Sequence, residues 1–73
     1  MITILFVNNS GGGFADRIGL SEGTTIGQLF ATQMPESRPE HYMIRANGAV
    51  VDSGYTIVDG DRVTFTPTKL DVA

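Results

Sequence analysis

An Asn-Gly pair inside residues 42–67 constrains this 73-residue chain more than any other feature. Asn47-Gly48 lies between two apolar runs, and this pair is the strongest short-range hairpin signal because a type I′ turn needs positive φ at both central residues. Asp59-Gly60-Asp61 marks a second turn, where glycine can take a left-handed conformation. Residues 62–66 then alternate polar and apolar side chains, as a strand with one buried face should. The stretch therefore predicts a hairpin, a loop and a final strand that must pair elsewhere.

Two more strands are predicted near the N-terminus. Residues 2–7 are rich in β-branched and aromatic side chains on both faces, which suits a central strand or a strand that carries an exposed apolar strip. Residues 14–20 form the second strand, with Arg17 on the side opposite the apolar residues. Asp16 occupies an apolar position of this strand, so we expect a bulge or an edge position near it.

A short helix is predicted over residues 26–34. Thr25 and Gln28 have the spacing of a capping box, in which each side chain bonds the backbone N–H of the other residue. Pro35 disfavours helical geometry at Met34 and ends the helix there. We expect residues 36–41 to be a polar connection without regular structure.

The expected domain is single and spans residues 1–67, and residues 68–73 are expected to be a disordered tail that folding does not need. Its core should contain the apolar residues that share the inner faces of the strands and the helix: Ile4, Phe6, Ile18, Leu20, Ile26, Leu29, Phe30, Ile44, Val63 and Phe65.

Composition excludes several classes of function. The chain has no cysteine, so cysteine metal sites and thiolate nucleophiles are absent. The net charge of −3 argues against a nucleic-acid partner, which needs clustered basic residues. No apolar run is long enough for a membrane span and no signal peptide leads the sequence, so we expect a cytoplasmic protein without a membrane partner. The five basic residues are scattered along the sequence: Arg17, Arg38, Arg45, Arg62 and Lys69.

No catalytic, metal or cofactor site emerges from the motifs. Residues 11–13 are three glycines, but a phosphate-binding loop needs a following Lys-Ser/Thr and a helix, whereas a strand follows here. Asp59 and Asp61 are too few for a calcium loop, so local hydrogen bonding in a turn is the better interpretation. His41 has no recognisable nucleophile or second ligand near it in the sequence. We therefore expect no enzymatic activity and no cofactor.

Three segments resemble the small sulfur-carrier proteins of thiamine and molybdopterin biosynthesis, which have the β-grasp or ubiquitin-like fold. They are residues 23–29 (GTTIGQL), 44–48 (IRANG) and 58–63 (VDGDRV). The resemblance implies an α+β fold, with a mixed sheet of four to five strands packed on one short helix in the order β-β-α-β-β-β. The carriers end in Gly-Gly, whereas residues 69–73 read KLDVA. A branched tail does not suit the narrow channel that Gly-Gly passes, so we expect no carrier activity.

The resemblance also implies which strands are neighbours, and with it a candidate surface. If Ile2, Ile4 and Phe6 face the helix, Leu5 and Val7 must point out of the open face of the sheet. Ubiquitin-like domains commonly bind partners through this face. The alternative is ordinary apolar surface, since more than half of a protein surface is apolar. The predicted partner-binding residues are Leu5, Val7, Met43, Arg45 and Thr64.

The resulting hypothesis is a small non-catalytic, ubiquitin-like module that binds a protein through this face, with self-association included among the partners. Two alternatives stay open at this point. One is a diverged sulfur carrier or protein modifier. The other is a small accessory subunit of a larger assembly, such as one from a phage.

Overall fold

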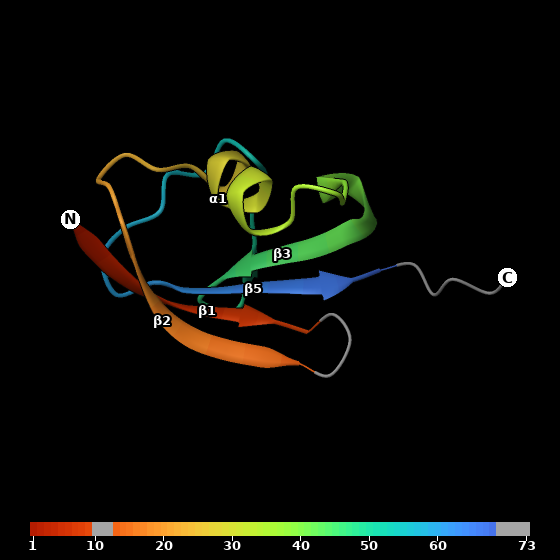
Figure 1. The fold of residues 1–73 in the computed structure, drawn as a ribbon, viewed down its shortest axis with the longest axis horizontal. Coiled ribbons are helices and arrows are strands. Elements are labelled where there is room, and N and C mark those ends of the chain that lie inside the picture. The colour runs from red at the N-terminus through yellow and green to blue at the C-terminus, as the bar shows by residue number, and fades with distance from the viewer. Residues whose placement is uncertain (10–12, 69–73) are drawn as a thin grey trace, which may run out of the picture.

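The computed structural model describes residues 1–9 and 13–68. The elements follow the predicted order, and Figure 1 shows the helix lying over one face of the sheet. Their bounds are β1 (Ile2–Asn8), β2 (Phe14–Leu20), α1 (Ile26–Gln33), the 3₁₀ helix η1 (Pro39–His41), β3 (Tyr42–Ala46), β4 (Ala49–Val50) and β5 (Arg62–Pro67). No helix in the described ranges is long and apolar enough to cross a membrane.

The described strands form one mixed sheet in the order β2-β1-β5-β3-β4. The last strand lies in the middle, where β5 runs parallel to β1 and antiparallel to β3. β2 is an edge strand, which explains how Asp16 is tolerated at an apolar position. Its register with β1 runs from Leu20 to Phe14 without a bulge, so the edge alternative is the correct one.

The turns form as predicted. Asn47 and Gly48 have φ of 56° and 88°, the positive values that a two-residue type I′ hairpin requires. Gly60 has φ of 87° in the second turn. The strand after the first turn, β4, spans only two residues, and an irregular segment leads from it to β5.

The capping box of α1 is confirmed. The backbone N–H of Gln28 donates to Thr25 Oγ1 at 3.3 Å, and the N–H of Thr25 donates to Gln28 Oε1 at 3.0 Å. Met34 is the C-cap residue, as expected before a proline. The prediction for residues 36–41 is wrong in part, because Pro39 starts the one-turn helix η1, where its fixed φ suits a first helical position.

The core agrees with the prediction at most positions. Ile18 and Leu20 are only partly buried, because they lie on the edge strand β2. Ile57 is 2% exposed and was not predicted. Its N–H donates to the carbonyl of Thr24 at 2.9 Å, which places this irregular segment against the start of α1. The fully or almost fully buried apolar residues are Ile2, Ile4, Phe6, Ile26, Leu29, Phe30, Ile44, Ala46, Ile57, Val63 and Phe65.

The predicted tail can be followed for one residue. The N–H of Thr68 donates to the carbonyl of His41 at 3.0 Å, so this residue is held to the last residue of η1, directly before β3. The rest of that prediction, residues 69–73, lies outside the described part of the chain.

Candidate partner-binding face

The alternation of side chains along β1 separates a buried face from a solvent-facing one. Ile2, Ile4 and Phe6 are buried on the side of α1. Leu5 and Val7 point the other way and are half-buried. We call this side the open face and define it by the strand residues whose side chains point away from α1. They are Thr3, Leu5, Val7, Ala15, Arg17, Met43, Arg45, Val50, Arg62, Thr64 and Thr66.

The register brings the predicted residues together. Val7 pairs with Thr64, and Thr64 pairs on its other side with Arg45. Met43 pairs with Thr66, next along the same face, and Leu5 is two residues from Val7. All five predicted residues thus lie on one face across three adjacent strands. Their role in binding stays a prediction.

Two arginines on this face were not among the predicted residues. Leu5 pairs with Arg17 of β2 on one side and with Arg62 of β5 on the other. An added Cβ at Gly48 would lie 3.8 Å from an Nη of Arg62, so the guanidinium group extends over the hairpin turn. The alternation in each strand already placed both arginines opposite the core, and the missing information was the register, which decides the residues that pair with Leu5.

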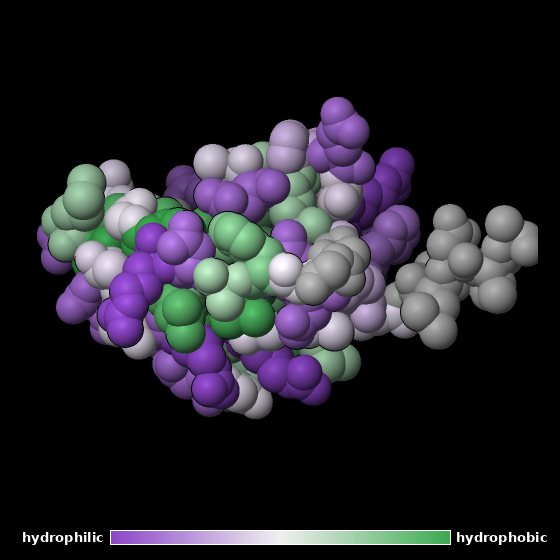
Figure 2. Space-filling model, turned by 60° about the horizontal axis from the view of Figure 1, so that its bottom comes forward, coloured by the Kyte–Doolittle hydropathy of each residue, from purple (hydrophilic) through white to green (hydrophobic). Residues whose placement is uncertain are grey.

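The charge of the open face has the opposite sign to that of the chain. Arg17, Arg45 and Arg62 are three of the five basic residues, while the chain carries eight acidic residues and a net charge of −3. Asp16 is the one acidic residue in the five strands, and it points to the side of α1, opposite Phe6. Figure 2 looks from the side away from α1 and shows apolar side chains gathered in the middle with hydrophilic ones around them.

A buried polar cluster holds the start of β5 behind this face. Asp61 is 3% exposed, and its Oδ1 accepts a hydrogen bond from Asn47 Nδ2 at 2.8 Å. Its Oδ2 accepts from the Tyr55 hydroxyl at 2.8 Å and from the N–H of Val58 at 3.0 Å. Asn47 Oδ1 in turn accepts from the N–H of Arg62 at 2.9 Å. The cluster therefore fixes the hairpin turn to the first residue of β5.

These contacts shift two pKa values in opposite directions. Burial acts to raise the pKa of Asp61, but the hydrogen bonds from Val58, Asn47 and Tyr55 outweigh it, so the pKa is lowered. The pKa of Tyr55 is raised, first by its hydrogen bond to Asp61, then by burial and by the negative charge of that carboxylate. The pair is thus an ionised carboxylate with a neutral phenol donor.

The turn interpretation of Asp59 and Asp61 is correct in kind, but the bonds reach further than the turn. Asp59 Oδ1 accepts from the N–H of Thr3 at 2.8 Å, which ties the turn to β1. Among the described residues, no group of three or more His, Cys, Asp or Glu residues could hold a metal ion. His41 is exposed on η1, and the neighbouring Glu40 pairs with Arg38 at 3.8 Å. Two residues of the glycine triplet, Gly11 and Gly12, lie outside the described residues.

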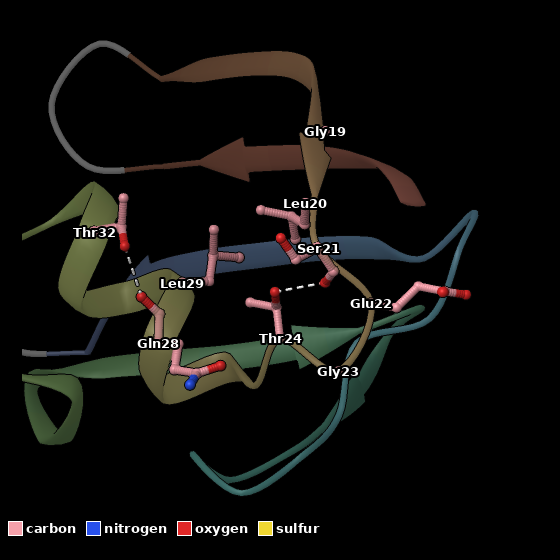
Figure 3. Close-up of a pocket in the computed structure, with 9 residues that line it drawn as sticks. All are labelled: Gly19, Leu20, Ser21, Glu22, Gly23, Thr24, Gln28, Leu29 and Thr32. Atoms are coloured by element: carbon pink, nitrogen blue, oxygen red, sulfur yellow. Dashed lines mark hydrogen bonds between the residues drawn. The ribbon is translucent and has the colours of Figure 1, made fainter. Parts of the chain in front are cut away.

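A groove of about 600 Å³ lies between the end of β2 and α1 (Figure 3). Its two threonine hydroxyl groups bond the chain itself: Thr24 Oγ1 donates to the carbonyl of Ser21 at 2.6 Å, and Thr32 Oγ1 donates to the carbonyl of Gln28 at 3.0 Å. The Glu22 side chain points away from the groove in Figure 3. Because its polar groups do not converge, the groove offers a ligand little beyond shape.

Known proteins resemble this chain in structure and not in sequence. No family model matches the sequence, and no curated protein matches it. A ubiquitin-like protein from the hyperthermophilic archaeon Caldiarchaeum subterraneum is 18% identical, with a TM-score of 0.69 over 96% of this chain and 100% of that chain. SAMP1 from Haloferax volcanii is 17% identical, with a TM-score of 0.73 over 96% of this chain and 99% of that chain.

A second structure, of H. volcanii small archaeal modifier protein 1, is 13% identical, with a TM-score of 0.71 over 92% of this chain and 98% of that chain. At such identities the likeness concerns the fold. It covers nearly the whole of each chain, and it agrees with the mixed sheet and single α-helix described above. The chain therefore has the β-grasp fold of ubiquitin-like proteins.

Proposed function

We propose that this chain is a non-catalytic, ubiquitin-like module that binds a protein partner through the open face. The observation that carries the proposal is the apolar second face of β1, on the side opposite α1. Leu5 and Val7 lie side by side along a strand whose other face is buried by α1. A central strand with apolar side chains on both faces needs cover on both, and a partner would supply the second cover.

The hydrogen bonds of the buried carboxylate support a non-catalytic role. Asp61 is the buried carboxylate among the described residues, and both of its oxygens accept hydrogen bonds within the fold. Its lowered pKa makes it a weak base. Such a carboxylate serves structure rather than proton transfer.

The proposal is tested by placing a charge in the middle of the open face. Leu5→Asp should abolish retention of the partner in a pull-down from the native host, quantified by mass spectrometry, because it replaces an aliphatic side chain in the middle of the face with a carboxylate that would occupy the flanking arginines. Thr32→Asp introduces the same charge on the exposed side of α1 and should retain the partner. Thermal unfolding followed by circular dichroism establishes that both variants fold.

Two results count against the proposal. If Leu5→Asp unfolds the protein, Leu5 belongs to the core and the face is assigned wrongly. If the folded Leu5→Asp variant retains the same proteins as the unchanged chain, the binding surface lies elsewhere.

A second candidate is a protein modifier or sulfur carrier, favoured by the structural likeness to H. volcanii small archaeal modifier protein 1 and to the Caldiarchaeum ubiquitin-like protein. The full-length protein, incubated with ATP, an activating enzyme from its host and a sulfide donor, would then acquire the mass of an adenylate or, after sulfide displaces AMP, of a thiocarboxylate. The positive control is the carrier that this enzyme normally activates, treated in parallel. If that carrier gains mass and the mass of the present protein stays unchanged, this candidate is removed.

A further inference from the structure

The open face combines two properties that together restrict its partner. Leu5 and Val7 form an aliphatic strip along β1, and Arg17 and Arg62 pair with Leu5 from the two neighbouring strands. Adjacent strands are about 4.8 Å apart, so the backbones of these two arginines are roughly 10 Å apart across the strip. Arg45 extends the positive charge to β3, beside Thr64.

Within residues 1–9 and 13–68, these three arginines also form no ion pair. The ion pair found among the described residues joins Arg38 and Glu40, in the connection between α1 and β3. No acidic residue occupies an open-face position in any of the five strands. The guanidinium groups of this face are therefore available to carboxylates of another molecule.

We infer that the partner segment is acidic and aliphatic: a stretch of another protein whose Leu, Ile or Val side chains cover Leu5 and Val7, with Asp or Glu side chains placed to reach Arg17, Arg45 and Arg62. This inference rests on the proposed function and adds the chemistry of the partner. The warrant is charge complementarity, since a positive face on a chain of net charge −3 selects partners by sign.

Two other occupants fit the face less well. A second copy, related by a two-fold axis, would place the arginines of one open face against those of the other with no carboxylate between them. A nucleic acid would leave the aliphatic strip without an apolar partner, and the acidic residues elsewhere on the chain would repel its phosphates.

The probe is a phage-displayed library of random 16-residue peptides, selected for binding to the full-length protein. Each enriched peptide is then tested for binding to the folded Leu5→Asp variant. We expect enriched peptides that contain several Asp or Glu residues around at least one Leu, Ile or Val. Affinities of the synthetic peptides follow from fluorescence anisotropy. Each of Arg17→Gln, Arg45→Gln and Arg62→Gln should weaken binding about two- to fivefold, and the triple variant roughly tenfold or more, in line with exposed ion pairs.

Arg38→Gln is the matched control, since it makes the same chemical change away from the open face, and it should leave the affinity unchanged. Raising the salt concentration should weaken peptide binding by the unchanged chain more than peptide binding by the triple variant. Neutral or basic peptides that need Leu5 would overturn the partner chemistry and leave the proposed function standing.

The remaining outcomes also decide. A library that yields no Leu5-dependent peptide overturns the acidic-segment inference, while the pull-down still judges the proposed function. A Leu5-dependent dimer in analytical ultracentrifugation, or Leu5-dependent binding of a fluorescent 20-nucleotide single-stranded DNA, replaces the acidic segment with a second copy or a nucleic acid.

Discussion

Replacing Asp61 with asparagine tests whether the buried cluster stabilises the fold in the way its geometry indicates. The substitution keeps the shape of the side chain and removes the charge and one acceptor. Asp61 receives donors on both oxygens, from Asn47 on Oδ1 and from Tyr55 and Val58 on Oδ2. Whichever way the new amide is turned, its NH₂ group faces either the Nδ2 of Asn47 or the N–H of Val58. Asn47 cannot simply turn its own amide, because its Oδ1 already accepts from Arg62.

The cost follows from these contacts. A buried donor left without an acceptor costs about 1–3 kcal/mol, and the remaining bonds lose the extra strength that a charged acceptor gives. Relief of the cost of burying a charge offsets part of this loss. We expect a net destabilisation of about 2–3 kcal/mol. A domain of 73 residues has a total stability of about 4–11 kcal/mol at about 0.05–0.15 kcal/mol per residue, so the change is large.

Urea denaturation at neutral pH measures the difference, with Asp59→Asn as the matched control. Asp59 is exposed and accepts from the N–H of Thr3 through one oxygen, which asparagine retains. The control should change the free energy of unfolding by less than about 0.5 kcal/mol, as for most surface substitutions. An Asp61→Asn variant within that same margin would falsify the argument, because it would mean that the donors find other partners.

The same pair of proteins gives a pH dependence with a definite sign. The pKa of Asp61 is lowered in the folded state, whereas an aspartate in the unfolded state has a pKa of about 3.9. As the pH falls below about 4, the unfolded state therefore binds a proton that the folded state does not, and the unchanged chain loses stability. Asp61→Asn lacks this group, so its deficit relative to the unchanged chain should shrink in that range. A constant deficit would contradict the lowered pKa.

Three further predictions concern other parts of the fold. The raised pKa of Tyr55 means that its contribution is present below pH 10.0 and lost as the pH rises through the folded value, so Tyr55→Phe should lose less stability than the unchanged chain in alkaline urea titrations. Ile57→Ala should cost about 2–5 kcal/mol in urea denaturation, since this side chain is 2% exposed, and a smaller loss than about 1 kcal/mol would mean that it does not fill the core. Asp16 lies on the edge strand β2, where its carboxylate accepts from the N–H of Arg17 at 2.8 Å. Charged residues on an edge strand oppose pairing with another chain, so Asp16→Ala should increase concentration-dependent association in analytical ultracentrifugation. A variant that stays as monomeric as the unchanged chain would show that this edge needs no protection.

Local chemistry explains why the turns and the helix could be predicted from the sequence. Asn47-Gly48 and the Thr25–Gln28 capping box each act within a few residues, and each forms as expected. Ile57 could not be predicted, because its burial comes from the contact of an irregular segment with the start of α1, and neither periodicity applies there.

The second role of Asn47 also lies beyond sequence reasoning. Its turn conformation is a local property, but the bonds of its side chain to Asp61 and to the N–H of Arg62 depend on which strand the turn meets. The candidate face likewise has features that follow from local sequence and features that depend on strand pairing. Alternation placed Leu5, Val7 and Arg45 on the open side, whereas the flanking of Leu5 by two arginines required the register of β1 with both β2 and β5.

Backbone hydrogen bonds connect the buried cluster to the open face. The N–H of Leu5 donates to the carbonyl of Asp61 at 3.0 Å, so the backbone that carries the aliphatic strip is bonded to the residue at the centre of the cluster. Arg62 follows Asp61 directly, and its N–H is held by Asn47. Loosening the cluster should therefore alter the spacing of Leu5 and Arg62 without touching either side chain. Binding that weakens in a folded Asp61→Asn variant would report that spacing, whereas binding that weakens in Arg62→Gln reports the charge.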